Sequence, residues 1–133
     1  MATCRAAVVL LPWTIGAATL GWFERIGDLP VCPNWASVID RLTGSSIDLL
    51  GGLKDVGMFL HDSLHTYDYE AEEFAAVEPS LRPDAIILSD NAHDSSALSD
   101  WAERSGRHYL FFKEQPLDHW WPGDGIGAAW AGR

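Results

Sequence analysis

The sequence predicts an α/β domain with a Rossmann-like, mostly parallel sheet flanked by helices. Two short apolar runs, residues 56–61 and 85–89, have the length and composition of buried strands. Between them, residues 69–81 carry apolar side chains at helical spacing and stop at a proline. A strand, a helix and a second strand in this order form a βαβ unit, and the two strands of such a unit are parallel.

Length and composition set the bounds of the prediction. The 133 residues are the size of one small domain, which we expect to span residues 1–133, and 47% of them are apolar, as in globular proteins. The formal net charge of −10 excludes the basic surface of a nucleic-acid-binding protein. Two cysteines, Cys4 and Cys32, fit no metal-binding spacing and favour free thiols in a reducing, cytoplasmic compartment.

The N-terminal part, residues 1–35, has the least regular pattern. Residues 6–11 have the composition of a buried strand, but no glycine-rich dinucleotide fingerprint follows them. Residues 6–23 carry no charge, and a secretory signal or a membrane anchor is the alternative interpretation of this run. A proline and two glycines interrupt it, so we favour a buried strand and turn and expect no membrane partner.

The other elements follow from local patterns along the chain. We expect strands at 35–42, 56–61, 85–89 and 108–113, helices at 47–54, 69–81 and 97–106, and a closing edge strand within 115–133. Ser46, Asp68 and Ser95 or Ser96 are the expected helix N-caps, and Gly106 ends the last helix. Phe74, Val77 and Leu81 form the expected inward face of the central helix, and the acidic residues within 68–78 are expected on its solvated face.

Oxygen-bearing side chains follow both strands of the βαβ unit. Asp62 comes directly after the first strand, and Asp90 and Asn91 follow the second. Ligands of open α/β sheets bind at the carboxyl ends of the strands, and carboxylate and amide oxygens suit Mg²⁺. The alternative is that these residues only cap helices or form turns.

Histidines lie close to both strand ends. His65, three residues after Asp62, is a candidate general base, because an imidazole can take a proton near neutral pH. The alternative for His65 is a surface loop position. His61 points the other way on strand alternation and is expected to be structural. His93 and Trp120 are candidate substrate contacts, although tryptophans in loops more often serve packing.

Residues 36–113 resemble the second half of class I S-adenosylmethionine (SAM)-dependent methyltransferases. The resemblance rests on a D-x-x-H-[ST]-Y segment that begins at Asp62, on L-[KR]-P followed by a strand, and on the Asp-Asn pair that ends this strand. Asp84 and Ala85 replace the two glycines that usually follow this proline. The similar group is that of metal-dependent O-methyltransferases.

This resemblance implies roles for individual residues. Asp62, Asp90 and Asn91 would bind Mg²⁺, and His65 would take the proton of a substrate hydroxyl that then attacks the methyl group of SAM. The glycine-rich cofactor strand of the family has no counterpart in residues 1–35. The N-terminal half is therefore truncated or altered, or another chain supplies it, and Ser45 and Ser46 are the candidate cofactor contacts.

The predicted function is Mg²⁺-assisted O-methyl transfer from SAM to a small hydroxylated molecule. One alternative is a non-catalytic methyltransferase-like module that binds a partner or forms a homodimer. Another is a metal-dependent hydrolase that uses the same carboxylates and His65 on an activated water. The sequence identifies neither the acceptor molecule nor the oligomeric state.

Overall fold

The computed structural model describes residue 42, residues 44–120 and residues 122–132. In chain order its elements are α2 (Ser46–Leu50), β1 (Val56–His61), α3 (Tyr67–Val77), the 3₁₀ turn η2 (Glu78–Ser80), β2 (Leu81–Ser89), α4 (Ala97–Arg104), β3 (Arg107–Lys113) and β4 (Gly125–Ala131). The strand expected at 6–11, the uncharged run 6–23, both cysteines and, apart from Leu42, the strand expected at 35–42 lie outside the described residues. None of the helices within the described ranges is long and apolar enough to cross a membrane.

Four strands form one sheet in the order β1-β2-β4-β3. β1 and β2 are parallel, as the βαβ unit predicts, and β4 runs antiparallel to both β2 and β3. Three of the described strands therefore share one direction, and the prediction of a Rossmann-like α/β fold is confirmed.

The position of β4 corrects one expectation. We expected the C-terminal strand at an edge, but it lies between β2 and β3, so β1 and β3 are the edges among the described strands. Small residues allow β4 to occupy this crowded place. A Cβ atom on Gly127 would lie only 2.8 Å from the Cβ of Ala92 and 3.0 Å from Leu98 Cδ2.

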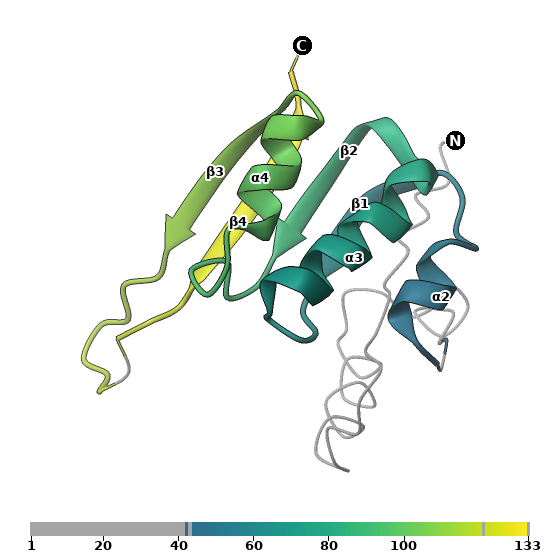
Figure 1. Cartoon of the computed structure of the whole chain (residues 1–133). Helices are drawn as coiled ribbons and strands as arrows, with labels where there is room; N and C mark the ends of the chain where they lie inside the picture. The colour runs from purple at the N-terminus through teal and green to yellow at the C-terminus, as the bar shows by residue number, and fades with distance from the viewer. Residues whose placement is uncertain (1–41, 43, 121, 133) are drawn as a thin grey trace, which may run out of the picture.

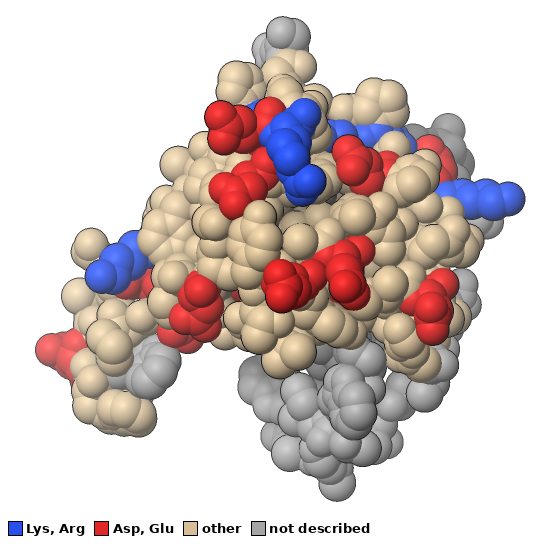
Figure 2. Space-filling model, viewed as in Figure 1, with Lys and Arg blue, Asp and Glu red and all other residues tan. Residues whose placement is uncertain are grey.

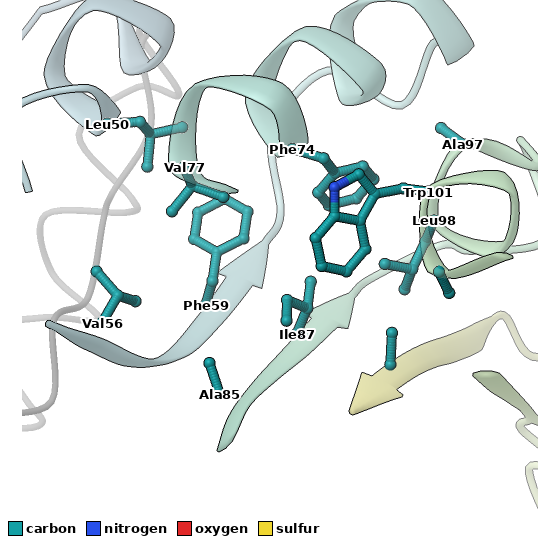
Figure 3. Packing of buried hydrophobic residues seen from close by; sticks show 12 residues of the cluster. Leu50, Val56, Phe59, Phe74, Val77, Ala85, Ile87, Ala97, Leu98 and Trp101 are labelled. Atoms are coloured by element: carbon teal, nitrogen blue, oxygen red, sulfur yellow. The ribbon is translucent and has the colours of Figure 1, made fainter. Parts of the chain in front are cut away.

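Helices α3 and α4 cover one face of the sheet (Figure 1). The core lies between these layers, where Phe59 and Ile87 from the strands meet Phe74 from α3 and Trp101 from α4 (Figure 3). The ring of Phe74 is fully buried and packs edge-on against Phe59, with 6.3 Å between the ring centroids. The predicted inward face is confirmed for Phe74 and its neighbour one turn on, Val77, and burial of these side chains fixes α3 on the sheet.

The opposite face of the sheet is also apolar, but its side chains are exposed. Met58 lies opposite Ile86 across β1 and β2, and Ile86 lies opposite Trp130 across β2 and β4. Exposed apolar side chains on this face come from all four strands: Met58, Leu60, Ile86, Leu110, Phe112, Ile126 and Trp130. This apolar face lies on the side of the sheet opposite to α3 and α4 (Figure 1).

The helix starts differ from two of the expected caps. Ser45, not Ser46, is the N-cap of α2, and Thr66, not Asp68, is the N-cap of α3. The backbone of Thr66 is extended, and its carbonyl accepts from the amide of Glu70. α3 therefore starts at Tyr67, two residues earlier than the acidic pattern indicates. Asp68 still lies in the first turn, where the helix dipole favours a negative charge. The predicted start of α4 is confirmed, with Ser96 as N-cap. The helix ends at Arg104, two residues earlier than expected, and Gly106 follows it with a φ of 67°.

Candidate functional site

The carboxyl ends of β1 and β2 lie side by side. His61, the last residue of β1, is paired with Ser89, the last residue of β2, and the amide of Asp90 donates to the carbonyl of His61 over 2.9 Å. The residues that follow the two strands therefore leave the sheet at the same point. This is the edge at which open α/β sheets bind their ligands.

One group of side chains at this edge, which we call the open cluster, consists of Asp62, His65 and Asp90, and Asn91 follows Asp90 in the chain. One ligand atom from each of the first three lies within 4.8 Å of the others. His65 Nε2 is 3.9 Å from Asp62 Oδ1, and the Asp62 side chain is 61% exposed. The structure thus brings together the two strand-end aspartates and the histidine on which the sequence prediction depends.

The charges of the open cluster are not balanced within it. Burial, followed by the nearby charge of Asp62, raises the pKa of Asp90. Asn91 has a left-handed backbone, with φ 48°, and its side-chain Oδ1 is buried without a hydrogen-bond partner. Two neighbouring carboxylates and an unsatisfied amide oxygen are a donor set that suits a hard divalent cation.

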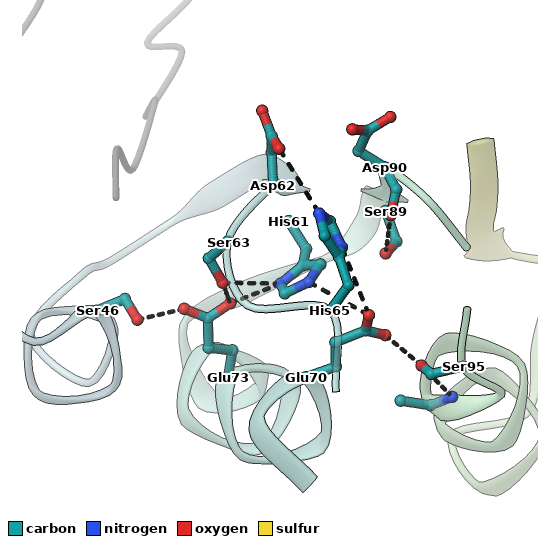
Figure 4. Close-up of polar contacts among 11 residues, drawn as sticks. Ser46, His61, Asp62, Ser63, His65, Glu70, Glu73, Ser89, Asp90 and Ser95 are labelled. Atoms are coloured by element: carbon teal, nitrogen blue, oxygen red, sulfur yellow. Dashed lines mark hydrogen bonds and ion pairs between the residues drawn. The ribbon is translucent and has the colours of Figure 1, made fainter. Parts of the chain in front are cut away.

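A second group, the buried cluster of His61, Glu70 and Glu73, lies on the helix side of β1 (Figure 4). His61 Nδ1 is 2.6 Å from Glu73 Oε2, and His61 Nε2 is 3.4 Å from Glu70 Oε1. The expectation that the acidic residues of 68–78 face solvent is wrong for these two, because Glu70 is 1% and Glu73 2% exposed. The expected orientation of His61, away from the open cluster and into the fold, is what the structure shows.

Serine hydroxyls complete the bonding of the two buried glutamates. Ser46 of α2 and Ser63 of the loop after β1 both donate to Glu73, Ser63 over 3.0 Å. Ser95, just before α4, donates to Glu70 Oε2 over 2.7 Å. The buried cluster therefore ties α2 and the start of α4 to α3 and β1.

The two buried carboxylates hold His61 in its charged form. Burial alone disfavours the imidazolium, but the nearby carboxylates of Glu70 and Glu73 outweigh it and raise the pKa of His61 to about 9. Burial likewise opposes ionisation of the glutamates, and His61, together with the serine hydroxyls, keeps the pKa of each below its usual value. The positive charge of His61 thus offsets one of the two negative charges of this cluster, and serine hydroxyls donate to both carboxylates.

His65 lies between the two clusters (Figure 4). Its Nε2 faces Asp62, and its Nδ1 is 3.7 Å from Glu70 Oε1. Sequence reasoning missed the buried glutamates, although their spacing contained the information. Glu70 and Glu73 share the i, i+3, i+4, i+7 pattern of the inward side chains Phe74 and Val77.

The remaining predicted site residues have other surroundings. Ser45 is exposed, whereas the buried Ser46 hydroxyl is bonded to Glu73 and lies 2.9 Å from the Tyr69 hydroxyl. His93 Nε2 lies 3.3 Å from Asp94 Oδ1 and 3.5 Å from Asp124 Oδ1.

His93 thus lies beside Asp124, the residue that precedes β4. Trp120 is 85% exposed and stacks on His119, with 5.6 Å between the ring centroids. The next residue, Trp121, lies outside the described residues.

The surface around the site is acidic. Figure 2 shows acidic side chains spread over the helix-covered face, with fewer basic ones among them. This distribution agrees with the net charge of −10 and is the opposite of a phosphate-binding surface.

Comparison with known proteins identifies relatives through structure only. No family model and no curated protein matches the sequence. One similar structure is the O-methyltransferase TomG from Streptomyces achromogenes, which is involved in tomaymycin synthesis and was solved in complex with SAM. The two chains are 16% identical, and their structures superpose with a TM-score of 0.65 over 94% of this chain and 61% of TomG. A precorrin-6y C5,15-methyltransferase from Geobacter metallireducens is 15% identical with a TM-score of 0.64, over 95% of this chain and 68% of that protein.

A third structure, a methyltransferase from Geobacter sulfurreducens, is 13% identical with a TM-score of 0.59, over 94% of this chain and 58% of that protein. At these identities the likeness shows only that this chain shares the fold of these three proteins. The chain spans about three fifths of the length of TomG.

Proposed function

We propose that this chain carries the catalytic half of a SAM-dependent O-methyltransferase that acts on a small hydroxylated molecule with the help of Mg²⁺. The observation that carries this proposal is the convergence of Asp62, His65 and Asp90 at the carboxyl ends of two adjacent parallel strands. In a methyltransferase fold, this edge of the sheet is the expected place for ligands and reacting groups. The likeness to TomG and other methyltransferases supports the type of reaction.

The donor set fits a magnesium ion. Asp62, Asp90 and Asn91 would hold it, because a cation would relieve the repulsion that raises the pKa of Asp90 and would satisfy the buried Asn91 Oδ1. When bound, Mg²⁺ supplies positive charge that favours the deprotonated form of a substrate hydroxyl.

His65 is the proposed general base of the reaction. Its Nε2 faces the open cluster and would take the proton of the substrate hydroxyl. The substrate oxygen then forms a bond to the methyl carbon of SAM while the bond from that carbon to sulfur breaks. His93 and Trp120 remain the proposed substrate contacts. Ser45 is the proposed cofactor contact, whereas the hydroxyl of Ser46 is already bonded within the fold.

A non-catalytic module that binds a partner is the second candidate function. One observation favours it: the apolar face of the sheet is exposed. Such a module would keep the sheet and would not turn over SAM.

Calorimetric titration of SAM into the folded chain, with and without Mg²⁺, tests the proposal. We expect saturable binding, and we expect Asp90→Asn to remove the effect of Mg²⁺ and methyl transfer while Asp118→Asn, at an exposed position, changes neither. A folded chain that binds no SAM under either condition would overturn methyl transfer by this chain alone and would favour the partner-binding module.

A further inference from the structure

We propose that His61, His65 and Glu70 form a binding site for Zn²⁺, which shares His65 with the open cluster and needs none of its aspartates. Three atoms define this site: His61 Nε2, His65 Nδ1 and Glu70 Oε1. They all lie within 4.8 Å of one another, and each is buried without a hydrogen-bond partner. Unsatisfied polar atoms that converge on one point inside a protein mark the place of a ligand.

The separations of these atoms match a tetrahedral zinc ion. Zn²⁺ binds imidazole nitrogen and carboxylate oxygen at about 2.0–2.2 Å, so two ligand atoms of a tetrahedron lie about 3.3–3.5 Å apart. Glu70 Oε1 is 3.4 Å from His61 Nε2 and 3.7 Å from His65 Nδ1. The two imidazole rings are nearly perpendicular, at 87° with 5.3 Å between their centroids. The third separation, between the two nitrogens, is at most 4.8 Å, so zinc would draw these side chains together.

The atoms on the far side of the ligands are already held in place. Glu73 lies 2.6 Å from His61 Nδ1, so the Nδ1 proton points at Glu73. Zn²⁺ would displace the proton from Nε2 of the charged imidazole and bind to the lone pair that this leaves. Ser95 donates to Glu70 Oε2, which leaves Oε1 for the same purpose. Carboxylates that orient metal-binding histidines in this way are a regular feature of zinc sites.

The donor set selects zinc over magnesium. Two nitrogens and one carboxylate oxygen form a set known from zinc sites, in which water or a substrate takes the fourth position. Mg²⁺ prefers oxygen ligands and suits the open cluster instead. The two carboxylates, Glu70 and Glu73, would balance the charge of the ion in this buried place.

Zinc would change the role of His65. A histidine that binds zinc through Nδ1 keeps its remaining proton on Nε2, and a base needs the lone pair of Nε2. Occupation of the zinc site and action of His65 as a base therefore exclude each other. Zn²⁺ is expected to inhibit methyl transfer.

Titration of ZnCl₂ against a chromophoric chelator, with the metal-free full-length chain, tests the site. We expect one equivalent of Zn²⁺ to bind. Glu70→Gln and His65→Asn should weaken binding at least tenfold, whereas Glu72→Gln, at an exposed position on the same helix, should leave it unchanged. Asp90→Asn should also bind zinc like the unchanged chain, which separates this site from the open cluster.

Substitution of the buried Glu70 also carries a risk of unfolding, which a second measurement avoids. His65 is the most exposed of the three ligands, and His65→Asn is expected to fold. ZnCl₂ should raise the thermal midpoint of the unchanged chain but not that of His65→Asn. The proposed site would be overturned if the unchanged chain binds no zinc. It would also be overturned if Asp90→Asn loses zinc binding while Glu70→Gln keeps it. Neither outcome bears on SAM binding, which tests the proposed function separately.

Discussion

His61 and Asp62 are neighbours in sequence but belong to two different clusters. Side chains alternate along a strand, so His61 enters the helix-covered side, where it is 1% exposed, and Asp62 leaves the strand end with a side chain that is 61% exposed. The buried cluster contains its own counter-charges, and the pKa values of His61 and its two glutamates all shift toward the charged forms. In the open cluster the pKa of Asp90 shifts toward the neutral form.

This difference separates a group that stabilises the fold from one that depends on an added partner. An internally compensated cluster is strongly destabilised when one member is removed, because the others stay buried and unpaired. A cluster with repelling charges gains stability when one charge is removed and loses its capacity to bind a cation. The same type of substitution is therefore expected to have opposite effects on stability in the two places.

Removal of His61 is the largest expected perturbation. His61→Leu leaves Glu70 and Glu73 buried without a positive charge, and we expect it to reduce the free energy of unfolding by about 3–5 kcal/mol. Urea denaturation of the metal-free chain measures this loss. Glu72→Gln, on the exposed side of α3, should stay within about 0.5 kcal/mol of the unchanged chain. Equal stability of His61→Leu and Glu72→Gln would contradict internal compensation.

The pH dependence of stability is the second prediction. The pKa of His61 is raised from 6.5 to about 9 in the folded state, so its contribution is complete below pH 6.5 and disappears as the pH rises toward 9. The loss is on the order of 3 kcal/mol, at about 1.4 kcal/mol per pH unit. Glu70 and Glu73 have lowered pKa values, so their contribution is present above about 4.5 and is lost as the pH falls.

The thermal midpoint of the metal-free chain should therefore be highest between about pH 4.5 and 6.5 and should decrease on both sides. In Glu73→Gln, one of the two charges that hold the proton on His61 is absent, and the decrease above pH 6.5 should be smaller. If the thermal midpoint of Glu73→Gln decreases above pH 6.5 as much as that of the unchanged chain, groups other than His61 cause the decrease.

The bond between Ser95 and Glu70 tests a smaller part of the buried cluster. Ser95→Ala removes the 2.7 Å hydrogen bond to Glu70 Oε2 and leaves that oxygen without this donor. We expect a loss of about 1–2 kcal/mol in the free energy of unfolding. Ser99→Ala, at a serine on α4 that bonds only to the backbone of Ser96, is the matched control and should have the smaller effect.

The smallest expected effect has the opposite sign. Asp90→Asn removes a carboxylate whose pKa is raised by burial and by Asp62, and without Mg²⁺ it should stabilise the chain by up to about 0.5 kcal/mol. The same variant should lose the stabilisation that Mg²⁺ gives to the unchanged chain. Destabilisation of metal-free Asp90→Asn would show that Asp90 has a structural role, such as the turn after β2.

The sequence predicted those features that follow from local periodicity. Two apolar runs around an amphipathic helix define the parallel pair β1 and β2, and the residues directly after each strand had to meet at one edge. Asp62 and Asp90 were found in this way. Glu70 and Glu73 were missed because acidic residues near a helix start usually face solvent, and only the position of His61 opposite them makes their burial favourable.

The position of β4 within the sheet could not be predicted from local sequence patterns, for a different reason. The glycines and alanines of β4 form no apolar pattern that predicts a buried strand. They matter because their small size leaves room for neighbouring side chains such as that of Leu98. The roles of the site residues in binding Mg²⁺, SAM and substrate stay predictions, because they depend on ligands rather than on the fold.

The insertion of β4 between β2 and β3 also has a consequence for the order of folding. β3 precedes β4 in the chain, yet its backbone joins the sheet only through β4. The βαβ unit of β1, α3 and β2 can assemble from neighbouring segments, whereas β3 has to wait until the segment after it has entered the gap. Sheet completion is thus the step with the longest loop to close, and it is expected to limit the folding rate.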